Sequence, residues 1–323
     1  MRFTQRLFLG SLAVAAAMAS PGAWSAFPDK RITLVVPTAA GGANDAIARV
    51  VAQAMSSILK QTVVVDNKAG ANGAIASEFV MRAAPDGYTL LLGYVATHAM
   101  NPALQRLRYD PVKDFVPVGM VGSSATVMVL NPGVKANDAK AVVALLKATP
   151  SKVSYASAGN GTAPHFAAEM FKLSTGTDML HVPYKGSAPA INDTIAGQTQ
   201  VMFPSLFTAI PYIKGGKLKV VGVAGSKRSA LMPNVPTLKE QGINDVDVSQ
   251  WYGIFAPANT PMPVVDALNK ALNQALAEKS VVQRLEGQGA EVATMTPSQM
   301  QIFVQQEQVK WKAVVQAAKL KAD

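Results

Sequence analysis

The sequence predicts an α/β protein in which strands and helices alternate along most of the chain. Short apolar runs typical of buried strands are followed by glycine-rich turns, and the turns by apolar residues at helical spacing. Three of these turns stand out, at 37–45, 157–162 and 184–188. Because strands that alternate with helices favour parallel sheets covered on both faces, we expect that arrangement here.

The first third of the chain predicts three strands and two helices. An apolar run at 32–36 is the first strand, and apolar side chains at helical spacing over 46–59 predict the first helix. A second strand at 63–65 ends at a polar turn, and a helix at 74–84 ends at the sequence Pro-Asp-Gly. The third strand is expected at 88–92.

The middle of the chain repeats this order, and the end is helical. Helices are expected at 136–149, 163–174, 188–196 and 205–214, and strands at 153–155, 179–182, 200–203 and 219–223. A long apolar and aromatic strand at 248–256 is followed by helices at 262–278, 281–286 and 297–319.

Two segments have the character of crossings between domains. Residues 116–130 contain two strand-like runs around a Gly-Ser-Ser sequence, and the strand at 248–256 mirrors them later in the chain. If both are hinges, a discontinuous first domain covers 26–121 and 251–323, and a second domain covers 122–250. Two consecutive domains fit the same pattern, so the sequence leaves both arrangements open.

The N-terminus has the features of a secretory signal peptide. Two arginines precede an apolar run at 7–18. This run is too short to span a membrane, and small residues follow it. Ala23 and Ser25 provide the small side chains required before a cleavage site, so we expect residues 1–25 to be removed as a signal peptide. This predicts a periplasmic protein, with an uncleaved membrane anchor as the alternative.

The composition predicts a soluble mature chain with a large core. No later stretch approaches the ~20 apolar residues of a spanning helix, and 323 residues suffice for one large or two ordinary domains. The chain has no cysteine, which excludes disulfides and a lipid-anchored cysteine.

The net charge is +10, but the basic residues are scattered along the chain. No run of lysines and arginines is present, and no basic stripe interleaved with aromatic residues, although both are typical of nucleic-acid binding. We therefore expect no nucleic-acid partner, and at most a contribution of the net charge to the attraction of small anions.

The three glycine-rich turns predict a binding site for an acid. Each would direct free backbone N–H groups, and the positive end of a helix dipole, toward a group above the turn. Glycine lets a ligand approach the backbone closely, and such turns bind carboxylates or phosphates. No nucleophile or metal cluster accompanies them, so the pattern favours capture of an acid over its conversion.

Motifs of enzymes are weak in this chain. Residues 159–164 follow a strand and open a helix as a dinucleotide-binding motif does, but its third glycine is missing. A Gly-x-x-x-x-Gly-Lys phosphate loop and a Gly-x-Ser-x-Gly elbow are both absent. His165 and Glu169 share a helix face by their spacing, which is more often structural than a metal site. We therefore expect no catalytic residue, no metal site and no cofactor.

Seven segments, taken in order, resemble one protein family. They are PTAAGGANDAIAR (37–49), APDGYTLLLG (84–93), NPALQRLRYDPVKDFVPV (101–118), YASAGNGTAPH (155–165), HVPYKGSAPAINDTIAGQTQVMF (181–203), NVPTLKEQG (234–242) and WYGIFAPANTP (251–261). Together they resemble the extracytoplasmic solute receptors of tripartite tricarboxylate transporters, also called the Bug family. The resemblance covers nearly the whole predicted mature chain.

This resemblance implies a two-domain periplasmic-binding-protein fold of the Venus-flytrap type, with crossing strands between the domains and the ligand in the cleft. It implies a small organic carboxylate as ligand, recognised largely by backbone amides and bridging waters. It also implies that the ligand is passed to a membrane permease, and it implies no cofactor.

Carried over residue by residue, the resemblance implies a ligand site spread over both domains. The implied ligand-binding residues are Thr38, Ala39, Gly42, Ala43, Asp45, Thr97, Ser157, Asn160, Gly161, Thr162, Tyr184, Ser187 and Ser205. Asp45 is expected to brace the first turn rather than to touch an anion, and Thr97 is a candidate hydroxyl contact. Because Ser, Thr, Asn and Gly also favour helix starts, plain capping is the alternative role at each position.

The chain departs from the family pattern at two places. Its first turn reads TAAGGAND where the family commonly has FPPGGGTD, so Thr38 and Ala43 are expected to reshape the pocket wall. Pro204 stands where members often carry aspartate, which puts one polar contact in question. Among the aromatic residues, Trp251 and Tyr252 are expected slightly more in the core than in the cleft, and Trp311 is expected to pack in the core.

The sequence therefore predicts a monomeric periplasmic solute-binding protein that captures a small organic carboxylate for the permease of a tripartite transporter. An exported receptor that signals to a sensor protein is the second interpretation, and an exported hydrolase on the same fold is the third. Recognition through the backbone leaves little side-chain signature, so the sequence does not identify the carboxylate.

Overall fold

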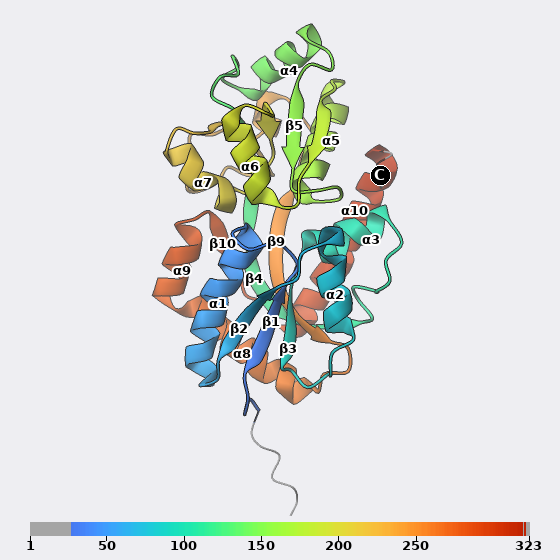
Figure 1. The fold of residues 1–323 in the computed structure, drawn as a ribbon, viewed down its shortest axis with the longest axis vertical. Helices are drawn as coiled ribbons and strands as arrows, with labels where there is room; N and C mark the ends of the chain where they lie inside the picture. The colour runs from blue at the N-terminus through green and yellow to red at the C-terminus, as the bar shows by residue number, and fades with distance from the viewer. Residues whose placement is uncertain (1–26, 319, 321–323) are drawn as a thin grey trace, which may run out of the picture.

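The computed structural model describes residues 27–318 and residue 320 of the chain. The predicted signal peptide and its cleavage site lie outside these residues. Two lobes, each an α/β layer structure, are connected by the strands β4 (Phe115–Leu130) and β9 (Ser249–Pro257). Figure 1 shows the second lobe above the first, with both strands running between them. The predicted α/β fold with two domains and crossing strands is confirmed.

The first lobe is built on a mixed sheet. Its strands are β1 (Ile32–Val36), β2 (Val63–Asn67), β3 (Thr89–Tyr94), β10 (Ala290–Val292) and parts of β4 and β9. β1 pairs in parallel with β2 and β3, and β9 is antiparallel to β3 and β4. The helices of this lobe are α1 (Ala43–Leu59), α2 (Ala74–Met81), α3 (Asn101–Leu104), α8 (Met262–Ala277), α9 (Lys279–Glu286) and α10 (Pro297–Ala318), with short helical turns η1 (Ala71–Gly73) and η2 (Ala96–Met100).

The second lobe holds the middle of the chain. Its strands are β5 (Ser154–Ser157), β6 (Leu180–Pro183), β7 (Val201–Met202) and β8 (Lys219–Ala224). β5 is parallel to β6 and β7, and the far half of β4 is antiparallel to β7 and β8. The helices are α4 (Ala139–Ala148), α5 (Ala163–Thr175), α6 (Ser187–Ala196), α7 (Leu206–Lys214) and the turn η3 (Lys239–Gln241).

β4 is one continuous strand of 16 residues, where the sequence predicted two runs separated by a glycine. Gly122 has a φ of +154° and lies at an irregularity of the ladder with β9. A Cβ there would lie 2.4 Å from the carbonyl oxygen of Glu291 on β10. The glycine therefore accommodates a bulge and a close backbone approach without ending the strand.

The C-terminal helices return to the first lobe. α8 packs against α1, and α10 packs against β4 and the helical turn η2. The predicted domain boundaries at 121/122 and 250/251 remain a prediction, because β4 and β9 belong to both lobes. None of the helices within the described ranges is both long enough and apolar enough to cross a bilayer.

The aromatic residues of the C-terminal part lie in the core. Trp251, Tyr252 and Trp311 are each 1% exposed or less, and the packing role expected for Trp311 is confirmed. The indole N–H groups of Trp251 and Trp311 both donate to Glu307 Oε2, at 2.9 and 3.0 Å. Trp311 also meets the ring of Phe166, on α5 of the second lobe, edge to face at 5.3 Å. α10 therefore contacts both lobes (Figure 1).

Candidate functional site

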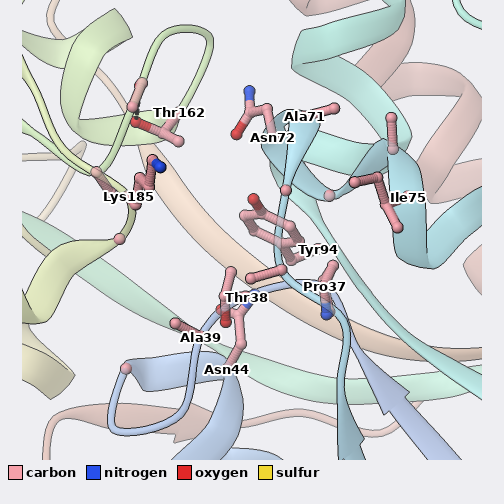
Figure 2. Close-up of a pocket in the computed structure, with 18 of the residues that line it drawn as sticks. Pro37, Thr38, Ala39, Asn44, Ala71, Asn72, Ile75, Tyr94, Thr162 and Lys185 are labelled. Carbon is pink, nitrogen blue, oxygen red and sulfur yellow. Dashed lines mark hydrogen bonds between the residues drawn. The ribbon is translucent and has the colours of Figure 1, made fainter.

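A cavity of about 1310 Å³ lies between the two lobes. The segments 37–44 and 69–75 of the first lobe line it, and the segments 158–164 and 183–189 of the second lobe contribute to the opposite wall. Figure 2 shows Thr162 and Lys185 on one side, facing Asn72 across the gap. All three glycine-rich turns singled out in the sequence therefore meet at one cleft.

Three helices, α1, α5 and α6, begin at this cavity without a side-chain cap, and α2 does so as well, with Gly73 as its N-cap residue. Gly42, Thr162 and Gly186 are the N-cap residues of α1, α5 and α6, and each of them lines the cavity. No side chain of these three residues bonds the free N–H groups of its helix. Away from the cavity, Asp138 and Ser205 cap α4 and α7 with their side chains, whereas α8 and α9 begin without such a cap. The uncapped starts direct N–H groups and helix dipoles to the cleft.

The first turn is braced by Asp45 from behind. Its carboxylate accepts from Gly41 N at 3.0 Å and pairs with Arg49 at 2.9 Å, one helical turn further on. Burial alone would raise the pKa of Asp45, but the bonds from Arg49 and Gly41 outweigh burial and hold that pKa below its ordinary value. Asp45 does not line the cavity, so in this arrangement it positions the turn without touching its contents.

Two polar groups of the first turn lack a partner where they line the cavity. Thr38 Oγ1 and Asn44 Nδ2 are buried atoms without a hydrogen bond within the described part of the chain. Figure 2 shows both residues at the floor of the cleft, below Tyr94. A buried polar atom without a partner costs about 1–3 kcal/mol. A polar ligand, or water held with it, would satisfy both groups.

The second turn is supported by a stack of three rings. His181 lies between Tyr155 and His165, with ring centroids 4.7 and 4.5 Å away. Ser157 Oγ lies 2.7 Å from His181 Nε2 and accepts from Gly159 N at 3.1 Å. Gly161 N donates to His165 Nδ1 at 3.1 Å. The backbone of the turn is thus fixed by groups beneath it.

The contact between Ser157 and His181 has the length of a nucleophile–base pair. Ser157, however, is fully buried and does not line the cavity. Its hydroxyl also holds the N–H of Gly159. The geometry therefore supports a structural role for this pair and gives the hydrolase interpretation no accessible nucleophile at this position.

The third turn contributes a cation to the cleft. Lys185 is exposed and lines the cavity between Tyr184 and Gly186, and no carboxylate among the described residues pairs with it. Beside it, the Tyr184 hydroxyl donates to Asp193 Oδ2 at 2.7 Å. Burial and this carboxylate raise the pKa of Tyr184 to about 12, so the phenol stays neutral.

The structure brings eight of the thirteen predicted site residues to the cavity wall. These are Thr38, Ala39, Gly42, Ala43, Asn160, Thr162, Tyr184 and Ser187. The other five do not line the cavity: Asp45, Thr97, Ser157, Gly161 and Ser205. Thr97 is buried against the backbone of Tyr94, and Ser205 caps α7 through Thr208 N.

Gly161 faces the other lobe rather than the cavity. A Cβ at this position would lie 2.7 Å from Asn72 Nδ2 and 2.8 Å from Asn101 Oδ1. These two asparagines are themselves joined, by a bond of 2.6 Å between their amides. Gly161 thus lies where the two lobes meet beside the cleft.

The sequence reasoning missed several residues of the cavity wall. Among them are Asn44, Asn72, Tyr94 and Lys185. Lys185 has a signal in the sequence, because it is the single cation inside a turn that the sequence predicts to bind an anion. Asn72 has none, since only the tertiary fold places η1 opposite the second lobe.

The two-lobed fold with uncapped helix starts at an interlobe cleft defines a periplasmic-binding-protein type of molecule. Residues 47–320 match the family described as the tripartite tricarboxylate transporter family receptor. The chain is 36% identical to the protein BugT of Bordetella pertussis, over 97% of both chains. The chain therefore belongs to the receptor family of tripartite tricarboxylate transporters, the Bug family.

Solved structures of similar proteins have the same fold. A structure described as a periplasmic transporter superposes with a TM-score of 0.89 at 41% identity, over 92% of this chain and 100% of the other. An R. palustris protein with adipate gives 0.88 at 30%, over 91% and 99%. MatC from Rhodopseudomonas palustris, with bound malate, gives 0.85 at 33%, over 90% and 100%.

Proposed function

We propose that this protein is the solute-binding receptor of a tripartite tricarboxylate-type transporter and captures a small organic carboxylate between its lobes. The observation that carries the proposal is the convergence of three uncapped helix starts, those of α1, α5 and α6, on one cavity. Free N–H groups and the positive ends of helix dipoles bind carboxylates at such places.

The charges of the cavity wall support an anionic ligand. Four basic side chains line it, Arg82, Arg106, Arg108 and Lys185, against one acidic side chain, Glu78. Glu78 is neutralised by Arg82, the C-cap residue of α2, whose Nη2 lies 2.9 Å from Glu78 Oε2. The remaining basic groups favour an acid over a neutral or cationic solute.

The relatives support the same class of ligand. The two R. palustris structures carry adipate and malate, which are both small carboxylates. We extend this class, without the particular compound, to the cleft of this chain. The eight predicted residues on the cavity wall, together with Asn44, Asn72 and Lys185, are the proposed ligand site.

The proposal includes the cellular setting. It comprises export through the signal peptide at 1–25, action as a monomer and delivery of the ligand to a membrane permease; the predicted N-terminus supports export, and the family supports delivery to a permease. Membership of a receptor family supports a binding role without catalysis.

The experiment compares carboxylates with their amides. The protein purified from the periplasm is titrated calorimetrically with adipate, malate and the corresponding diamides. Binding of a dicarboxylate, with no binding of its diamide, is expected because only the charged group gains from helix dipoles and Lys185. Equal or tighter binding of the diamides would overturn the proposal. N-terminal sequencing of the same sample shows whether cleavage occurs after Ser25.

A further inference from the structure

Two large apolar side chains are exposed inside the cleft. Ile75 is 51% exposed and Phe79 is 47% exposed, and both line the cavity. They lie four residues apart on α2, so they share one face of that helix. The exposed surfaces of these two side chains do not pack in the core of the lobe, whereas a ligand in the cleft would cover both.

Around this pair, the cavity extends away from the starts of α1, α5 and α6. Figure 2 shows Ile75 on the far side of Ala71 and Asn72 from Thr162 and Lys185. The loop 105–108 also lines the cavity and brings the half-buried Leu107 to it. We call the surface formed by Ile75, Phe79 and Leu107 the apolar arm.

The apolar arm ends near basic groups that have no partner. Arg106 and Arg108, on either side of Leu107, are exposed, and no carboxylate in the described ranges forms an ion pair with them. Directly after α2, the Arg82 guanidinium forms an ion pair with Glu78. Lys68 Nζ lies 4.3 Å from the centroid of the Phe79 ring and forms an ion pair with Asp66. A second anionic group therefore has available cations beside Leu107.

The volume of the cavity agrees with a ligand that is longer than a short diacid. Sites of about 300–1,000 Å³ hold drug-sized molecules. The cleft of this protein measures about 1310 Å³, and its wall includes residues of α2 and of the loop 105–108 in addition to the starts of α1, α5 and α6.

Building on the proposed function, we propose that the ligand is an elongated organic acid with a hydrophobic body. One carboxylate would lie at the starts of α1, α5 and α6. The hydrocarbon body would lie on the apolar arm, and a second carboxylate would reach Arg106 and Arg108. Ile75 and Phe79 are then residues that determine specificity by ligand length.

The test is a homologous series of linear dicarboxylates from adipate (six carbons) to sebacate (ten carbons). Each methylene buried on the apolar arm should tighten binding about fourfold, which corresponds to about 0.8 kcal/mol. In the double variant Ile75→Ser/Phe79→Ser this increase with length should fall to less than twofold per methylene. The affinity for adipate should change less than that for sebacate.

Ile302→Ser is the matched control, because Ile302 is 55% exposed on α10 and lies outside the cavity wall. It should keep the wild-type dependence on length. Thermal melting of all variants checks the fold, which exposed side chains are expected to leave intact. An affinity that does not rise with length in the wild type, or rises equally in the double variant, would overturn the apolar arm alone. Failure of every linear dicarboxylate to bind would also overturn the apolar arm, whereas the proposed function is decided separately by the comparison of carboxylates with their amides.

Discussion

Lys185 is the side chain whose charge most directly concerns the ligand. It is exposed at the cavity wall and has no carboxylate partner among the described residues. A hydrogen bond to a charged group contributes about 1.5–3 kcal/mol, so Lys185→Met should weaken carboxylate binding at least about tenfold. Lys185→Arg should retain most of the affinity. Calorimetry on both variants measures the effect.

The control for Lys185 is Lys152, an exposed lysine away from the cavity. Lys152→Met removes the same charge from the protein as a whole and should change the affinity less than twofold. Equal losses in the two methionine variants would show that only the net charge matters, which contradicts a direct role of Lys185.

His98 predicts how the stability of the protein depends on pH. It is fully buried and stacked on Phe255 at 3.8 Å, and burial lowers its pKa from 6.5 to about 3. Below pH 6.5 the unfolded chain binds a proton that the folded chain does not bind until about pH 3, so folding stability falls as pH decreases through this window. The loss from pH 7 to pH 5 should be about 2 kcal/mol from this residue.

Urea unfolding of the wild type and of His98→Gln at both pH values measures this contribution. The variant is expected to be less stable at pH 7, because it disturbs packing, but to lose about 2 kcal/mol less than the wild type on acidification. The same loss in both proteins would assign the pH dependence to other groups.

At the scale of elements, the second turn depends on the groups beneath it. Ser157→Ala removes the acceptor of Gly159 N and the contact with His181. Each lost neutral bond costs about 0.5–1.5 kcal/mol, so we expect a lower melting temperature and about fivefold weaker ligand binding, because the turn loosens.

Ser56 offers a matched control outside the cleft. Its hydroxyl also holds two backbone groups, accepting from Val63 N at 2.8 Å and donating to Ala52 O at 2.6 Å. Ser56→Ala should lower the melting temperature by a similar amount and leave ligand affinity unchanged. If Ser157→Ala affects stability alone, the turn does not need this support for binding.

Most strands and helices could be predicted because each follows from local pattern. The apolar run at 32–36 became β1 with the same bounds, and the turns at 157–162 and 184–188 start α5 and α6 as expected. Five short elements, α3, β10, η1, η2 and η3, lack a clear signal of this kind. β10 is three residues long and depends on pairing with β4, and η2 carries apolar residues that fit a helix or strand alike.

The site divides in the same way. Residues such as Gly42 and Thr162 could be predicted as cleft residues because a turn before a helix sets their position in the sequence. Asn72 and the apolar arm could not, because α2 and the loop 105–108 reach the cleft only through the folding of the first lobe. Thr97 shows the reverse case, since its hydroxyl satisfies the backbone of Tyr94 and is buried away from the cavity.

At the scale of the whole molecule, the contact of Gly161 with Asn72 and Asn101 concerns the approach of the two lobes. Gly161→Ala adds a methyl group whose carbon would lie only 2.7 Å from Asn72 Nδ2. The lobes must therefore separate, or the asparagine side chains must move. Overpacking of this kind costs about 1–3 kcal/mol, which predicts at least about fivefold weaker ligand binding. Small-angle scattering should show less contraction on addition of ligand than in the wild type.

Gly176 separates this effect from backbone strain. Its φ of +61° is close to the +74° of Gly161, but a Cβ there meets nothing within 4 Å. Gly176→Ala should therefore lose a similar amount of stability, about 1 kcal/mol, with unchanged affinity and scattering. Weaker binding in both variants would point to strain rather than to the contact between lobes.

The two indoles that share Glu307 give the protein an intrinsic fluorescence signal. The chain has three tryptophans, and cleavage after Ser25 would remove Trp24, leaving Trp251 on a crossing strand and Trp311 against Phe166 of the second lobe. If the lobes close by a hinge motion, we expect Phe166 to shift relative to Trp311 and the polarity around the indole ring to change. Emission of the unlabelled protein should therefore follow closure in real time, and a stopped-flow experiment could resolve ligand capture from lobe movement without any dye.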